Sequence, residues 1–351
     1  VTGVQTCALP ICSLENAVKN TDLSGYLRLR VNTTHSEATE ASDVANEQKG
    51  VLNFKSKVND SVTANMKFVA VGGSKSDSLN FNQANFIVAG GSYTAIVGKQ
   101  TAQSPFVANN GDTVATGATV LVPAGPVTLA AGHFTGMNGN INGYDGVVDA
   151  ANPTGLQLKN SAQDISAAAI IGTFGPVNAS LWYANIGSDL ADAVSLNLNG
   201  TVGPVNVDLT HSSAELGAAG SEDETLTKLI VSGKVANVNL VAGYGVTNDT
   251  AARVHGVDLT SDEDAKTNFR LDQLVLDGLS DADALLLGAS MAFGKTTVGI
   301  NYLMVDVGTL DMTEVDLNVA YAMSKNFSIT GLYSDTNNDG GDDSRMERSE
   351  E

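Results

Sequence analysis

The chain has 351 residues and is acidic, with 19 Lys and Arg residues against 39 Asp and Glu residues and a formal net charge of −20. This balance argues against nucleic-acid binding, which requires a basic surface. No uninterrupted apolar run approaches the roughly 18–20 residues of a membrane-spanning helix, so the sequence also excludes a helical membrane protein.

The first segment, residues 1–12, contains both cysteines of the chain, Cys7 and Cys12. It lacks the basic start and the long apolar run of a secretion signal. We interpret it, together with residues 341–351, as non-native sequence, and a divergent secretion signal is the alternative for the first segment. Residues 13–340 are then expected to form one unit whose C-terminal strand is missing.

The first predicted strand is DLSGYLRLRVN, residues 22–32, in which Arg28 and Arg30 alternate with Leu27, Leu29 and Val31. An alternation of period two is the pattern of a strand with one apolar face. The same pattern recurs through the chain, for example in AVSLNLNGTV at 193–202 and VNVDLTHS at 205–212, which only a Gly-Pro turn separates.

Short turns and long polar segments follow one another along the whole chain. The short turns join strands of about 8–12 residues, near the ~9–11 residues of a tilted membrane strand. We expect these turns at 58–61, 90–92, 123–126, 175–178, 203–204, 235–237, 294–295 and 324–326. The longer segments between the hairpins are 33–50, 72–78, 101–117, 135–164, 186–192, 212–224, 247–282 and 307–310.

This arrangement predicts an all-β fold, a transmembrane antiparallel up-and-down β-barrel. Eight hairpins and the unpaired first strand give about 17 strands in this fragment, and a lost last strand would give the even number, about 18, of bacterial outer-membrane barrels. Short turns at one end and long loops at the other belong to the same plan. The alternative is a soluble β-sandwich or an extended β-rich surface protein, but soluble strands average about 5–6 residues.

With this plan, the chain resembles the campylobacter-type major outer membrane protein, a porin family. The residues that carry the resemblance are LENAVKNTDLSGYLRLRVN (14–32), VLNFKSKVNDSVTANMKFVA (51–70), FIVAGGSYTAIVGKQ (86–100) and VLVPAGPVTLAAGHF (120–134). The resemblance implies an 18-stranded diffusion porin that assembles as a homotrimer. It also implies that the loop at 101–117 folds into the pore.

Basic residues gather on the first strands. If the apolar residues face lipid, Arg28, Arg30, Lys55, Lys57 and Lys67 face the lumen, because a basic residue on the lipid face would cost ~2–4 kcal/mol at the midplane. Lys99 begins the pore loop and its direction is ambiguous. A basic wall opposite Asp112 of the loop would filter ions and orient solutes. The alternative is that these bases are solvated without selective importance.

Metal and enzyme chemistry find little support. The acidic run at 258–283, with adjacent Asp262, Glu263 and Asp264, could bridge calcium, but its spacing is not that of an EF-hand. The resemblance associates the family with calcium in the pore, although the loop at 101–117 keeps only Asp112. No nucleophile or metalloprotease motif accompanies the four histidines. We therefore expect no catalytic residues, no protein-bound metal and no required cofactor.

The function expected from the sequence is passive diffusion of ions and small hydrophilic solutes across the outer membrane of a Gram-negative bacterium. The expected partners are outer-membrane lipid, further copies in a homotrimer, and the solutes themselves. The alternatives are a substrate-specific channel and a non-conducting surface barrel or adhesin.

Overall fold

The computed structural model describes residues 20–36, 40–73, 77–107, 113–138, 144–148, 156–158, 164–186, 191–216, 223–249, 265–338 and 341–350. Within these ranges, no helix is long and apolar enough to cross a membrane.

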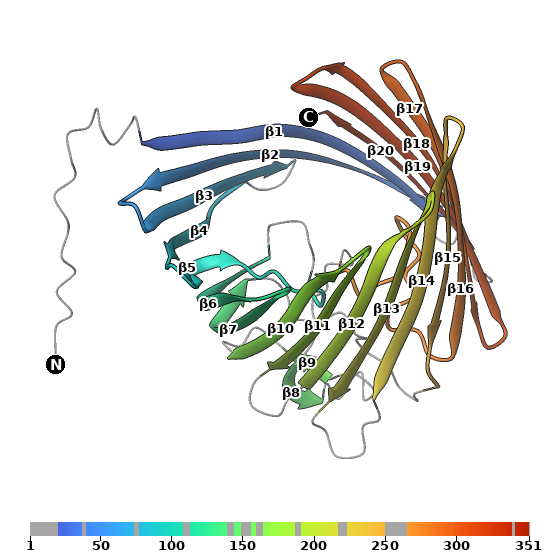
Figure 1. The fold of residues 1–351 in the computed structure, drawn as a ribbon. Helices are drawn as coiled ribbons and strands as arrows, with labels where there is room; N and C mark the ends of the chain where they lie inside the picture. The colour runs from blue at the N-terminus through green and yellow to red at the C-terminus, as the bar shows by residue number, and fades with distance from the viewer. Residues whose placement is uncertain are drawn as a thin grey trace.

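The main body is one 18-stranded antiparallel sheet that closes on itself (Figure 1). Strands that follow one another in the chain pair, except that β7 pairs with β10, and β1 pairs with both β2 and β20. The strands are β1 (Thr21–Ser36), β2 (Ala41–Lys57), β3 (Val62–Gly73), β4 (Asp77–Ala89), β5 (Thr94–Thr101), β6 (Val114–Ala124), β7 (Val127–Asn138), β10 (Ile165–Phe174), β11 (Val177–Ile186), β12 (Ala191–Val202), β13 (Val205–Leu216), β14 (Glu224–Val235), β15 (Val238–Thr247), β16 (Ala282–Phe293), β17 (Thr296–Val307), β18 (Leu310–Ser324), β19 (Phe327–Asn338) and β20 (Gly341–Glu350). A separate two-stranded sheet joins β8 (Tyr144–Val148) and β9 (Leu156–Leu158).

The eight predicted short turns are confirmed as the connections of eight hairpins. Four of them begin with a glycine, at Gly125, Gly175, Gly203 and Gly294, with φ between 62° and 64°. This left-handed conformation suits the tight turn of a hairpin and is open to glycine without steric cost. The local sequence therefore specifies the short connections at one end of the barrel, which have two residues at these four glycines and four residues between β2 and β3 and between β4 and β5.

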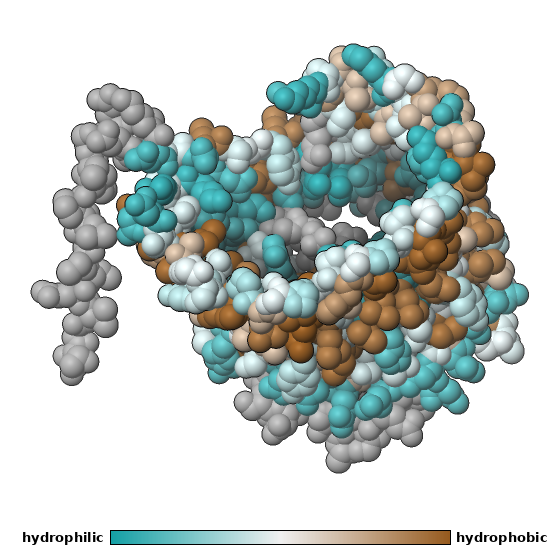
Figure 2. Space-filling view, in the orientation of Figure 1, coloured by the Kyte–Doolittle hydropathy of each residue, from teal (hydrophilic) through white to brown (hydrophobic). Residues whose placement is uncertain are grey.

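Side chains alternate between the outer and inner surfaces of the barrel. Leu23 and Leu27 are each 64% exposed on the outer face, whereas Val51 and Val69 are 2% and 4% exposed on the inner face. Figure 2 shows a hydrophobic band on the outer wall and hydrophilic residues around the visible opening. Outer positions also form cross-strand aromatic contacts, with Phe68 stacked on Phe81 at a centroid distance of 4.8 Å. Such a surface matches hydrocarbon outside and water inside.

Residues 341–350 form the closing strand, whereas we expected that strand to be missing from the chain. β20 pairs with β19 on one side and with β1 on the other, so 18 strands are present rather than 17. Its sequence, GDDSRMERSE, lacks apolar alternation. The backbones of β1 and β19 nevertheless need hydrogen-bond partners, because an open sheet edge is not stable in lipid.

The first hairpin is also longer than expected. Most of the predicted polar segment 33–50 belongs to strands, since β1 runs to Ser36 and β2 starts at Ala41. This difference matters for the lumen because it adds further inward positions to β2.

Candidate functional site

Most of the predicted basic residues lie on one inner wall formed by β1, β2 and β3. Strand register places Arg28 opposite Lys49, Lys55 opposite Asn65, and Lys67 opposite Asn53. These residues share the parity of the buried Val51 and Val69, which face inward. Arg28, Arg30, Lys55, Lys57 and Lys67 therefore all occupy inward positions, and we refer to them, with Lys49, as the basic wall.

Both arginines of the basic wall are ion-paired. Arg28 Nη2 donates to Glu47 Oε1 of β2 at 2.6 Å, and the Arg28 side chain is 18% exposed. Arg30 Nε lies 2.8 Å from Glu347 Oε1 of β20. The closing strand thus supplies one of the two carboxylates. Because each arginine sits beside an opposite charge, the wall is less positive than its count of bases indicates.

Lys57 lies at the rim, where β2 enters its turn. Its Nζ is 2.9 Å from Asp60 Oδ1, and both side chains are well exposed. The hydrogen bond from Lys57 and its positive charge lower the pKa of Asp60 below the ordinary carboxyl value. This pair is solvated, and because Asp60 offsets the charge of Lys57, Lys57 adds little net positive charge at the rim.

Lys99 faces a different direction from the other predicted bases. It lies opposite Ala84 of β4 and Thr116 of β6, on the outward parity, and its Nζ donates to the carbonyl oxygen of Phe81 at 2.8 Å. The neighbouring residue Gln100 takes the inward position and is only 5% exposed. Lys99 therefore does not line the lumen with the others. Asp112, the predicted acidic partner of the wall, lies outside the described residues.

Lys49 is an inward base that the sequence analysis missed. It is only 9% exposed and lies opposite Arg28 across β1 and β2. The parity of Lys55 and Lys57 extends to Lys49 by steps of two residues, so the signal was present. It was hidden because residues 33–50 were expected to form a loop.

Two chain segments fold into the lumen. Segment A comprises residues 102–107, after β5, and belongs to the predicted pore loop, although Thr101 and residues 114–117 are in strands. Segment B comprises residues 265–281, before β16, and was not expected to enter the pore. The amide of Thr267 in segment B donates to the carbonyl oxygen of Pro105 in segment A at 3.1 Å. The two segments are therefore connected inside the barrel.

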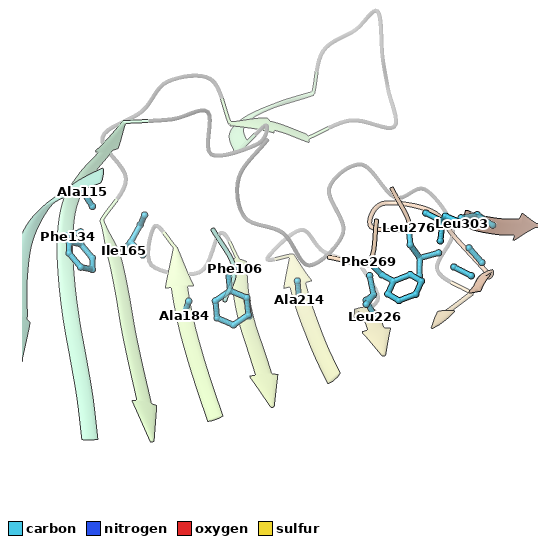
Figure 3. Close-up of a cluster of buried hydrophobic side chains, with 14 residues drawn as sticks. Phe106, Ala115, Phe134, Ile165, Ala184, Ala214, Leu226, Phe269, Leu276 and Leu303 are labelled. Atoms are coloured by element: carbon cyan, nitrogen blue, oxygen red, sulfur yellow. The ribbon is translucent and has the colours of Figure 1, made fainter. Parts of the chain in front are cut away.

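Phe106 attaches segment A to the inner wall. Its side chain is fully buried in an apolar cluster that includes Ala184 and Ala214. Figure 3 shows Phe106 between Ala184 and Ala214 in the row of strands. Small apolar residues at inward positions leave room for the ring, whereas polar residues occupy inward positions elsewhere. Burial of a phenylalanine of this kind contributes on the order of 1.5–3 kcal/mol.

Phe269 and Leu276 attach segment B in the same manner. Phe269 is 2% exposed and Leu276 is fully buried, beside Leu226 and Leu303 of the wall (Figure 3). The inward glycines of β15 make this packing possible. A Cβ atom at Gly245 would lie 2.7 Å from Leu276 Cδ2 and 3.0 Å from Phe269 Cδ1, and Gly243 is equally close to Phe269. The two glycines of the Gly-x-Gly sequence of β15 therefore leave the space into which segment B packs.

Two charged side chains of the wall also bind segment B. Lys228 of β14 donates from Nζ to the carbonyl oxygens of Lys266 and Asn268, each at 2.5 Å. Glu314 of β18 is fully buried and accepts hydrogen bonds from the backbone amides of Gln273 at 2.8 Å and Leu274 at 2.5 Å. Hydrogen bonds to charged groups contribute about 1.5–3 kcal/mol each. Segment B is thus fixed near its start, at residues 266–268, and in its middle, at residues 273–274.

A cavity of 1040 Å³ lies between segment A, part of segment B and the walls of β3–β7 and β10–β14. Side-chain amides line it on both sides. On one wall Asn65 donates to Gln83 at 2.7 Å, and Gln83 donates to Thr101 at 2.6 Å. On the other wall Asn178, Asn199 and Asn197 form a chain of hydrogen bonds of 3.0 and 2.6 Å. Trp182 also borders the cavity.

Metal binding has no support among the placed side chains. In the described part of the chain, no group of three His, Cys, Asp or Glu residues is placed to hold a metal ion. Asp262, Glu263 and Asp264, the carboxylates of the possible calcium segment, lie outside the described residues.

The comparison with protein-family models decides the family. The model described as "Gram-negative porin" matches residues 6–341, nearly the whole chain. The chain belongs to the Gram-negative porins. It is accordingly a porin of the bacterial outer membrane, and its barrel provides a passive path for solutes. Members of this family are channels, not enzymes. A comparison with curated proteins found no match.

Solved structures share the architecture of this porin. OpdO of Pseudomonas aeruginosa has a TM-score of 0.76 at 16% identity, with 95% of this chain and 98% of that chain covered. OccAB4 of Acinetobacter baumannii gives 0.74 at 13% identity, with coverages of 94% and 97%. OccK2 (OpdF) of Pseudomonas aeruginosa, solved in complex with glucuronate, gives 0.71 at 15% identity, with coverages of 93% and 95%. At these identities, the likeness establishes the fold alone.

Proposed function

We propose that this porin admits ions and small hydrophilic solutes through a pore that segments A and B narrow together. The observation that carries the proposal is the attachment of both segments to the inner wall and to each other. Segment A belongs to the loop at 101–117 that the sequence predicts as the constriction. Segment B, from the C-terminal half of the chain, adds a second element to the constriction. The open cross-section of the pore is therefore set by two segments.

The basic wall tunes this pore. Lys49, Lys55 and Lys67 carry positive charge along one side of the lumen, while Glu47 and Glu347 offset Arg28 and Arg30. Because the bases of the wall outnumber these two carboxylates, we expect a weak preference for anions. A ring of fixed charges filters ions by electrostatic attraction and repulsion. No reaction, cofactor or calcium ion is needed for this mechanism.

The finer family assignment and the assembly are part of the same proposal. The motifs at 14–32, 51–70 and 86–100 support a relationship to the campylobacter-type major outer membrane protein. Membership of that group implies a homotrimer. Crosslinking in outer-membrane vesicles, followed by electrophoresis without heating, tests this assembly, and a purely monomeric barrel would contradict it.

Liposome swelling with uncharged solutes of increasing size tests the pore itself. Liposomes that contain the refolded chain should swell in isotonic small polyols, and the rate should fall steeply as solute size grows. Equal rates for all solutes would contradict a narrowed pore. Saturation of the rate by one solute would instead support a substrate-specific channel, the alternative function.

A further inference from the structure

The cavity beside segment A is lined in a manner that favours one class of solute. We propose that it is a binding site for neutral polyhydroxylated solutes, that is, sugars and polyols, and that it admits them in preference to organic anions. This inference rests on the proposed function, since a solute must enter the pore to reach the cavity.

Asn and Gln side chains form the largest class of polar residues around the cavity. They come from β3–β5 and segment A on one side and from β11 and β12 on the other. An amide offers both an acceptor oxygen and a donor NH₂ group. Adjacent hydroxyls of a sugar also donate and accept, so one amide can bind two of them. A carboxylate group only accepts hydrogen bonds, so it can use the NH₂ groups of these amides, while the amide oxygens beside them would repel it.

Hydrogen bonds between neighbouring side chains hold these amides in fixed orientations. Asn199 Nδ2 donates to Asn197 Oδ1 at 2.6 Å, and Asn197 Nδ2 donates to Asp208 Oδ1 at 2.7 Å. On the facing wall, the bond from Asn65 to Gln83 fixes the orientation of both amides. An amide offers two donor hydrogens and two acceptor lone pairs, so Asn65, Gln83 and Asn199 each keep donor and acceptor capacity after these bonds. Asn197 donates to both Asp208 and Thr210 and keeps acceptor capacity only. A row of fixed amides can therefore receive a solute with little loss of side-chain entropy.

Few charged side chains border the cavity. The charged residues that border the cavity are Asp208, Lys228 and Lys266. Lys228 is engaged by two backbone carbonyls, and Asp208 accepts from Asn197 and Thr210. The arginines and the remaining lysines of the basic wall do not border this cavity. Lys266 is exposed at the border of the cavity. An anion would thus meet one available cation here, against the several bases of the space beside β1 and β2.

The cavity also has an aromatic surface, the indole ring of Trp182. Trp182 takes an inward position on β11, opposite Ser195, and is partly buried against the apolar cluster. It also borders the cavity that contains the amides. The face of an indole ring is a favourable apolar surface for the C–H groups of a sugar, while the rim hydroxyls of the sugar reach polar neighbours. Amides together with one aromatic ring thus match both parts of a sugar.

Blockade of single-channel current by glucose and by glucuronate tests the inference with two solutes of the same ring and different charge. Glucose should block the open current in a saturable manner and more strongly than glucuronate does. Trp182→Leu and Asn197→Leu should each weaken glucose blockade by roughly fivefold, the factor that corresponds to a net contribution of about 1 kcal/mol.

The matched controls occupy outward positions. Tyr183→Leu lies next to Trp182 on the lipid face, and Asn46→Leu lies opposite Val31 on the outer face of β2. Both should leave glucose blockade unchanged. Open current without any glucose blockade, or stronger blockade by glucuronate, would overturn the sugar site while leaving the porin function intact. Absence of open current in a folded barrel would instead contradict the proposed function.

Discussion

Thr267 and Pro105 join the two inward segments of the barrel, because the Thr267 amide donates to the Pro105 carbonyl oxygen at 3.1 Å. These residues come from distant parts of the chain. Neither segment is a free loop end, and each limits the movement of the other. The pore is therefore expected to keep a constant width, with changes only when an attachment to the wall is removed.

Phe269→Ala should widen the pore. The change removes a ring that is 2% exposed against the glycines of β15, and a buried phenylalanine-to-alanine change typically costs about 3–5 kcal/mol. Segment B would then leave the wall, and the single-channel conductance should rise. Phe86→Ala is the matched control, since Phe86 is 54% exposed on the lipid face. Equal conductance in the two variants would show that Phe269 does not fix the constriction.

Lys228→Met should make the open current noisier. The variant keeps the aliphatic part of the side chain but removes the bonds to the carbonyl oxygens of Lys266 and Asn268. Those two carbonyls would lose a charged donor, which costs about 1.5–3 kcal/mol per bond. Lys234→Met, an exposed position on the same strand, should behave as wild type. A quiet current in Lys228→Met would count against the attachment.

Glu314→Gln should expose segment B to protease. The carboxylate accepts from the amides of Gln273 and Leu274, and an NH₂ group at one oxygen position would face a donor instead. Trypsin should then cleave after Arg270 faster than in wild type, as followed by mass spectrometry. Asp311→Asn, an exposed change on the same strand, serves as the control. An unchanged rate of cleavage in Glu314→Gln would show that this carboxylate does not hold segment B against the wall.

Charge reversal should reveal the pairing in the basic wall. Arg28→Glu places two carboxylates side by side at the Glu47 contact, so the reversal potential in a salt gradient should shift toward cation preference. The exchange variant R28E/E47R restores the pair with its charges swapped and should return the selectivity close to that of wild type. If the exchange variant stays as shifted as the single one, the 2.6 Å pair does not determine the local field.

Much of the barrel could be predicted from the sequence because its signals are local. A Gly-Pro turn such as Gly203-Pro204 and an alternation such as Val194 to Leu198 depend only on neighbouring residues. Their physical causes, the left-handed conformation of glycine and the two faces of a strand, act over two to eight residues. The inward direction of Arg28 and Lys67 followed from the same alternation.

The remaining features depend on contacts between distant segments. β20 could not be recognised, since its only outward apolar residue among those described is Met346 and its pairing is a property of β1 and β19. Segment B lies in an acidic stretch of the sequence, and acidic stretches are typical of solvent-exposed loops. Its signal was the set of apolar residues spaced between Phe269 and Leu279, together with the inward glycines of β15. Only the fold shows that these two sequences meet.

The most direct test of the central claim is single-channel recording of the full chain in a planar bilayer, together with the variant F106A/F269A. We predict a stable ohmic open current in the wild type and a larger current in the variant, because both inward segments lose their attachment to the wall. A barrel that is folded, as judged by heat-modifiable electrophoretic migration, but carries no current would contradict the account. So would equal conductance of the two proteins.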